Sequence, residues 1–146
     1  MSEIRFYHLT RKRLEQALPE LLEKTVERKW RAVVLTDSQQ RAEYLAQFLW
    51  TYRGDSFLPH GAARDGGGEN QPLWITDKDE NPNGADVLFL IDGATTQSVP
   101  SYRLVCELFD GNNEQAVSLA RQRWAAYKNE SHTLSYWKQT EKGWEK

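Results

Sequence analysis

Two aspartates each follow a run of apolar residues, a pattern typical of metal or nucleotide sites in α/β proteins. Asp37 follows Val33-Val34-Leu35-Thr36, and Asp92 follows Val87-Leu88-Phe89-Leu90-Ile91. Parallel strands end at one edge of a sheet, so the two carboxylates could converge there and hold Mg²⁺. The alternative is that Asp92 simply opens a turn with Gly93. One hypothesis is therefore an enzyme that uses a nucleotide or a metal ion at this edge.

A glycine-rich loop is expected over 61–70 and contains Gly66-Gly67-Gly68. A phosphate-binding loop would end in Gly-Lys-Ser/Thr, and a dinucleotide site needs Gly-x-Gly-x-x-Gly between a strand and a helix. The chain carries neither motif. We therefore predict a surface loop and no cofactor.

The remaining nucleophiles and metal ligands do not form a recognisable catalytic set. His8, His60 and His132 show no zinc-binding spacing. Cys106 lies in an apolar run and is expected to be inert core, and no serine stands in a Gly-x-Ser-x-Gly context. We predict no catalytic residue and no metal site.

The expected helix over 114–128 carries two contrasting stripes. The stripe expected to face a sheet is small and apolar apart from one arginine: Ala116, Leu119, Ala120, Arg123 and Tyr127. A second stripe follows at steps of four, three and four: Val117, Arg121, Trp124 and Lys128. An aliphatic side chain, a guanidinium, an indole and an ammonium on one face can bind an acidic peptide with a hydrophobic anchor. The alternative is a partly buried tryptophan with basic residues near the carboxyl end of a helix.

The elements that must position these residues alternate between strands and helices. Strands are expected at 4–9, 31–37, 73–76, 87–91 and 103–109, and helices at 14–30, 38–52 and 114–128. A short extended piece is expected at 56–60, and a weak edge strand within 134–144. This order predicts one α/β domain over 1–146, with helices on both faces of a mostly parallel sheet in three layers.

Composition narrows the function classes. The 146 residues include 19 Lys and Arg against 21 Asp and Glu, a net charge of −2. This balance argues against a general nucleic-acid binder, although a local basic patch stays possible. Direct binding of single-stranded DNA through exposed tryptophan and arginine is a third hypothesis that the charge disfavours. Without a membrane-length apolar window, a signal peptide pattern or a second cysteine, we expect a cytoplasmic protein.

Several stretches resemble one protein family, in order and over nearly the whole chain. They are 6–9, 17–24, 48–50, 55–61 and 119–128. The chain resembles the chi subunit of bacterial DNA polymerase III holoenzyme. The Ser-Phe-x-Pro-His-Gly stretch at 56–61 and the last helix are the specific parts of the match.

The resemblance implies a Rossmann-like fold and a non-catalytic clamp-loader accessory protein. The family binds the acidic C-terminal tail of single-stranded-DNA-binding protein, which ends in an aromatic residue and a free carboxylate. It also binds the psi subunit, which links it to the clamp loader. DNA would then be contacted only indirectly, with no membrane involved.

The resemblance also assigns roles to residues of the last helix. Arg121 matches the central basic residue for the tail, Trp124 an aromatic, and Lys128 a basic position. Val117 and Ala125 stand where better-known members carry lysines, so the basic rim is thinner here.

Two further residues receive roles from the same resemblance. Phe57 matches an aromatic of the apolar pocket, where Val117 and Trp124 would help to enclose the terminal ring of the tail. Trp50 matches an aromatic of the psi-facing surface. Arg64, to which the resemblance assigns no role, lies in the glycine-rich loop and could compensate for the thinner rim.

Overall fold

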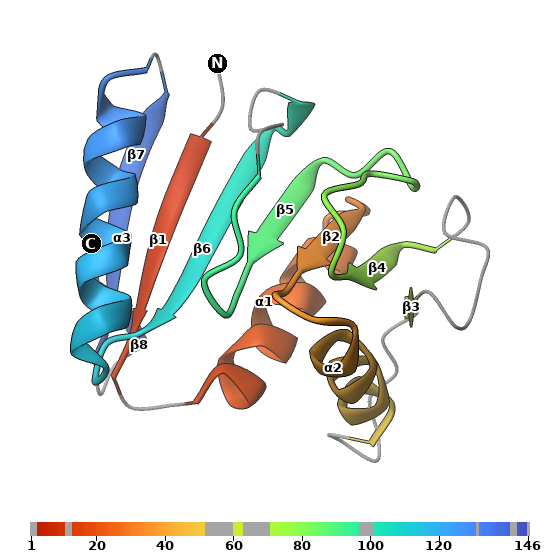
Figure 1. Cartoon of the computed structure of the whole chain (residues 1–146). Coiled ribbons are helices and arrows are strands. Elements are labelled where there is room, and N and C mark those ends of the chain that lie inside the picture. Colours follow the sequence, from red (N-terminus) through yellow and green to blue (C-terminus); the bar gives the residue numbers. More distant parts are fainter. Residues whose placement is uncertain are drawn as a thin grey trace.

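The computed structural model describes residues 3–10, 13–51, 60–62, 71–96, 101–130, 132–140 and 143–145. The strands are β1 (Glu3–Leu9), β2 (Ala32–Leu35), β3 (His60–Ala62), β4 (Leu73–Thr76), β5 (Val87–Leu90), β6 (Leu104–Asp110), β7 (Thr133–Thr140) and β8 (Gly143–Glu145). The helices are α1 (Leu14–Glu27), α2 (Gln39–Thr51) and α3 (Glu114–Lys128) (Figure 1).

These strands form one sheet in the order β3-β4-β2-β5-β6-β1-β7-β8. Every described pair of neighbours is parallel except β7 with β8, which is antiparallel. The fold is therefore the predicted α/β class, a three-layer Rossmann-like arrangement with a mostly parallel sheet.

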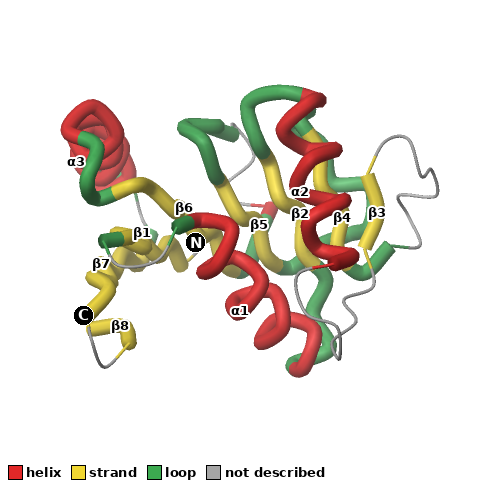
Figure 2. Tube along the Cα trace, turned by 90° about the horizontal axis from the view of Figure 1, so that it is seen from below, coloured by secondary structure: helices red, strands yellow, loops and turns green. Residues whose placement is uncertain are grey.

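Alternate residues of the central strands feed two separate cores. In β2, Ala32 and Val34 point to the core beneath α1 and α2, whereas Val33 and Leu35 join the core on the face that carries α3. Figure 2 shows α1 and α3 on opposite sides of the sheet. Burial on both faces explains why these strands are continuous apolar runs in the sequence.

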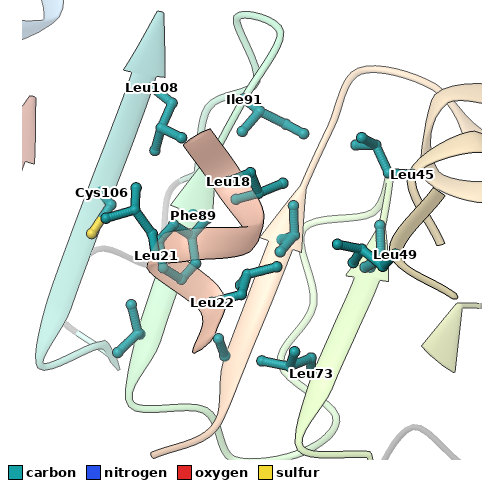
Figure 3. Close-up of a cluster of buried hydrophobic side chains, with 14 of the residues drawn as sticks. Leu18, Leu21, Leu22, Leu45, Leu49, Leu73, Phe89, Ile91, Cys106 and Leu108 are labelled. Carbon is teal, nitrogen blue, oxygen red and sulfur yellow. The ribbon is translucent and has the colours of Figure 1, made fainter. Parts of the chain in front are cut away.

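The first core is built largely from leucines of the two helices. Leu18, Leu21 and Leu22 of α1 and Leu45 and Leu49 of α2 pack over the sheet (Figure 3). Cys106 also lies in this core, as predicted, and burial raises the pKa of its thiol to about 12. A thiol that stays protonated is a poor nucleophile, which fits a packing role.

Three differences from the sequence-based expectation stand out beside shifts of one or two residues at other element ends. Helix α1 ends at Glu27 rather than Trp30, because Lys29 adopts a φ of 61° that no right-handed helix can continue. Gly61, assigned to a loop, lies in β3 beside β4. The C-terminal stretch, expected as a weak edge strand, instead places β7 inside the sheet, where it pairs with β1, and only β8 lies at the edge.

No helix in the described ranges is long and apolar enough to cross a membrane.

Candidate functional site

Helix α3 is fixed at both ends by its own sequence. Asn113 caps it, with Oδ1 accepting a hydrogen bond from the backbone N–H of Ala116 at 3.0 Å. Glu114 lies in the first turn and Lys128 in the last, where each charge is favourable to the helix dipole. The predicted bounds of this helix are confirmed.

The sheet-facing stripe of α3 is mostly as predicted. Ala120 and Tyr127 are buried, and Arg123 reaches the sheet, where its Nε donates to Oε1 of Glu107 on β6. Leu119 was placed on this stripe wrongly, since it is 42% exposed. It precedes Ala120 by one residue, or about 100° around the helix, so both cannot face the sheet.

A small cavity of about 200 Å³ opens between α3, the end of β6 and β7. It is lined by Phe109, Val117, Ala120, Arg121, Trp124 and Tyr136. Three members of the second stripe therefore come together at one apolar pocket. Hereafter this is the α3 pocket.

Ring packing makes Trp124 a fixed wall of the α3 pocket. Its indole meets the ring of Phe6 edge to face, with centroids 5.2 Å apart, and the ring of Tyr136 at 6.0 Å. Phe6 is completely buried in β1. Trp124 is therefore partly buried, which was the alternative to a peptide-binding face. Its indole nevertheless lines the cavity, so the two interpretations are compatible.

Among the described residues that line the α3 pocket, Arg121 alone is charged. Its side chain is exposed and forms no ion pair with any described residue. Arg123, two residues along, is instead paired with Glu107. The five in-plane N–H donors of Arg121 are therefore available to a ligand.

Behind the α3 pocket, Tyr136 and His8 are linked by a hydrogen bond between the phenol oxygen and Nδ1. Burial raises the pKa of Tyr136, and the charge of Arg121 opposes that rise. Burial also lowers the pKa of His8, and the positive charges of Lys138 and Arg121 add to the effect. The imidazole is therefore neutral near pH 7, so Arg121 dominates the charge at the pocket mouth.

An aromatic-walled hollow with one unpaired guanidinium at its rim suits a particular ligand chemistry. The hollow can take one apolar or aromatic side chain, and the guanidinium can hold a carboxylate through two parallel hydrogen bonds. A peptide that ends in an aromatic residue offers both groups within that one residue.

The remaining predicted site residues fall elsewhere. Lys128 is exposed in the last turn of α3 and does not line the cavity. Phe57 and Arg64 lie outside the described residues, as do Gly66-Gly67-Gly68. Trp50 lies in the last turn of α2, and its side chain is outside the described part of the chain.

Sequence reasoning missed the strand residues of the α3 pocket, Phe109 and Tyr136. Phe109 is the penultimate residue of β6, and Tyr136 stands opposite Phe6 in the pairing of β1 with β7. The available signal was the alternation of Leu134 and Tyr136 toward the α3 side, with Trp137 toward the other core. Its meaning depends on placing β7 beside β1.

Asp37 and Asp92 lie close together at the carboxyl edge of the sheet, as predicted. Asp92, however, is already engaged by neighbouring side chains. The hydroxyl of Thr36 lies 2.6 Å from Asp92 and 3.4 Å from Asp37. Arg41 bridges Asp92 at 2.9 Å and Glu15 at 2.8 Å. A cavity of about 600 Å³ lies beside this network. It is lined by residues from the end of β1 and the start of α1, and from the end of β6 and the start of α3.

Metal chemistry is not supported at that edge. The Arg41 guanidinium neutralises the carboxylate of Asp92 that a cation would need. Within the described ranges no three His, Cys, Asp or Glu side chains gather in a way that could hold a metal ion.

The fold and site define an open, doubly wound α/β protein with an amphipathic pocket between its last helix and the sheet. Residues 1–135 match the family described as "DNA polymerase III chi subunit, HolC". The chain belongs to the DNA polymerase III chi subunit family, which places it among the proteins of DNA replication.

One curated relative is "Probable DNA polymerase III subunit chi" of Rickettsia prowazekii (strain Madrid E). It is 36% identical over 91 residues, which cover 62% of this chain and 55% of that protein. The match therefore spans about half the length of the relative.

Proposed function

We propose that this chain is a non-catalytic accessory subunit of DNA polymerase III that binds the acidic C-terminal tail of single-stranded-DNA-binding protein. It acts as one domain over 1–146, in the cytoplasm. The observation that carries the proposal is the unpaired Arg121 at the rim of the aromatic-walled α3 pocket. Membership in the chi family supports it.

The binding mode follows from the two parts of the α3 pocket. The terminal carboxylate of the tail pairs with Arg121, while its terminal aromatic ring enters the hollow between Val117, Trp124 and Tyr136. Acidic residues upstream are steered by Lys128, which lies about 10 Å along the helix from Arg121. In this binding mode one terminal residue of the tail both neutralises Arg121 and fills the α3 pocket.

The second part of the proposal is a bridge to the clamp loader through the psi subunit, on the surface that includes Trp50. This assignment rests on the family resemblance. Replacing Trp50 with alanine should weaken the complex with a co-expressed psi subunit and leave tail affinity unchanged. Loss of both activities would show a folding defect instead, which the circular dichroism spectrum would reveal.

The tail-binding half is tested by fluorescence anisotropy with a labelled acidic peptide that ends in Pro-Phe. We expect micromolar affinity, about −8 kcal/mol, for the wild type. Arg121→Ala removes a charge-assisted contact worth roughly 1.5–3 kcal/mol and should weaken binding about ten- to a hundredfold.

The matched control is Lys78→Ala, which makes the same change in net charge at an exposed site on the carboxyl edge. Its affinity should equal that of the wild type. Amidation of the peptide's C-terminus should weaken wild-type binding and have little further effect on Arg121→Ala. Equal loss in both proteins would mean that Arg121 does not hold the carboxylate.

A further inference from the structure

Basic residues gather where α1 ends and β2 begins. The connecting segment is Arg28-Lys29-Trp30-Arg31, and Arg103 directly precedes β6 at the same edge of the sheet. We call Arg28, Lys29, Arg31 and Arg103, with Trp30 between them, the amino-edge cluster. Figure 1 shows this end of the sheet opposite to the end where α3 begins.

Trp30 organises two of these cations. The guanidinium carbons of Arg28 and Arg103 each lie 5.3 Å from the centre of its indole ring. A guanidinium stacked on a ring uses its face for that contact and keeps its in-plane N–H donors free. The indole therefore holds two phosphate-binding groups in fixed positions near each other.

Three cations of the cluster are available to a ligand, whereas Arg31 donates a hydrogen bond to the carbonyl of Asn83 at 3.2 Å. All four side chains are exposed, and Arg28, Lys29 and Arg103 form no ion pair with a described residue. Three acidic residues adjoin them: Glu27 in α1, Asp86 before β5, and Glu3, whose backbone N–H donates to the carbonyl of Arg103. The carboxylate of Glu3 is paired with Arg5, so positive charge still predominates.

The opposite edge of the sheet is acidic. Asp37, Asp77, Asp92 and Asp110 stand at the carboxyl ends of β2, β4, β5 and β6. A chain with a net charge of −2 can therefore still present a positive surface at its amino edge, because part of its negative charge, that of Asp37, Asp77 and Asp110, lies at the other end, where Arg41 neutralises Asp92.

Lys29 adds an unusual backbone feature. It has a φ of 61°. At this end of α1 the N–H of Lys29 donates to the carbonyl of Val26, and the N–H of Trp30 donates to the carbonyl of Thr25. Glycine is the residue that fits this position with least strain. A lysine there gives up stability and adds one more charge beside Arg28.

We propose that the amino-edge cluster binds the sugar-phosphate backbone of single-stranded nucleic acid. The ligand must be a polyanion, since Arg28, Lys29 and Arg103 are exposed, form no ion pair with a described residue and lie near one another on one edge of the sheet. The chain belongs to a DNA replication family, which favours nucleic acid over an acidic protein. The choice of a single strand rests on the proposed function, which places the protein on single-stranded-DNA-binding protein.

The test is an anisotropy titration of the full chain with a labelled oligo-dT of about thirty nucleotides, without the tail peptide. For about three phosphate contacts, affinity should fall about twentyfold between 50 mM and 200 mM salt. In Arg28→Gln/Arg103→Gln the same change in salt should cost only about threefold, and affinity at 50 mM should drop about tenfold or more. Lys78→Gln at the acidic edge is the charge-matched control and should bind like the wild type.

Several outcomes would overturn the proposal. They are no salt-dependent binding by the wild type, equal loss in the control variant, or equal binding of a duplex of the same length. If Arg28→Gln/Arg103→Gln lost affinity for an acidic peptide but kept its affinity for DNA, the partner of the cluster would be a protein instead. Arg121→Ala should bind the oligonucleotide normally, and the double variant should bind the tail peptide normally, so failure of either site is distinguishable from failure of the other.

Discussion

Arg123 donates its Nε–H to the carboxylate of Glu107 beneath α3, and this ion pair ties the helix to β6. The Glu107 side chain is only 2% exposed and that of Arg123 17%. Burial raises the pKa of Glu107, while the charge of Arg123 acts in the opposite direction. The two arginines of this stretch thus have separate tasks: Arg123 holds the helix, and Arg121 faces solvent.

Arg123→Ala should therefore destabilise the fold, and Arg121→Ala should not. Removing one partner of a buried ion pair leaves an uncompensated charge and costs about 3 kcal/mol. An exposed substitution usually changes stability by no more than about 0.5 kcal/mol. Urea unfolding of both variants measures the difference. Equal stabilities would show that Glu107 does not depend on Arg123.

Trp124 should serve both stability and binding, because its ring packs on Phe6 and lines the α3 pocket. We expect Trp124→Ala to lose about 2 kcal/mol of unfolding free energy and about tenfold in tail affinity. Trp124→Phe keeps an aromatic wall and should lose less than about threefold in affinity. Leu119→Ala, an exposed change on the same helix, is the control and should leave both quantities unaltered. If Trp124→Ala bound the tail with wild-type affinity, the indole would make no contribution to the binding site.

The stability of the fold should decrease on mild acidification through His8. Burial lowers the pKa of His8, and Lys138 and Arg121 add repulsion; a hydrogen bond to the backbone of Gly111 and the charge of Asp110 oppose the shift. The unfolded chain therefore takes up this proton at higher pH than the folded chain does. The contribution of His8 is complete above about pH 6.5 and is lost as the pH falls below that value.

Unfolding free energies at several pH values between about 8 and 5 test this for the wild type and His8→Gln. Glutamine cannot titrate, so the variant should show the shallower dependence on pH. Parallel curves for the two proteins would mean that the imidazole of His8 contributes nothing to the pH dependence of the unfolding free energy.

Lys29→Gly should stabilise the protein by up to about 1 kcal/mol. Glycine adopts the positive φ of this position without the steric cost of a Cβ atom, and that gain exceeds its larger entropy in the unfolded chain. Thermal unfolding gives the shift in midpoint, with Lys24→Gly, inside α1, as a control that should destabilise. A lower midpoint for Lys29→Gly would show that contacts of the lysine outweigh the backbone strain.

The buried strands and the last helix could be predicted because local chemistry determines them. β5 is apolar at every position since both of its faces are covered, and α3 begins where Asn113 can cap it. β7 could not be placed in the same way. Its polar residues resemble an exposed edge, and its position inside the sheet depends on pairing with β1, about 130 residues away along the chain.

The same division applies to the α3 pocket. Val117, Arg121 and Trp124 share one face of a helix, so their spacing alone predicts that they lie together. Phe109 and Tyr136 reach the pocket only through the order of strands in the sheet. The pairing of Arg123 with Glu107 was also hidden, since both residues lie within apolar patterns whose relative register is set by packing.

The central claim, that a tail peptide occupies the α3 pocket, is tested most directly by a ¹⁵N NMR titration with the Pro-Phe peptide. We predict that the amide signals of Val117, Ala120, Arg121 and Tyr136 and the indole signal of Trp124 shift together, saturating at micromolar peptide. Signals of β2 and β4 should stay in place. Saturable shifts confined to another surface, or none at all, would contradict it.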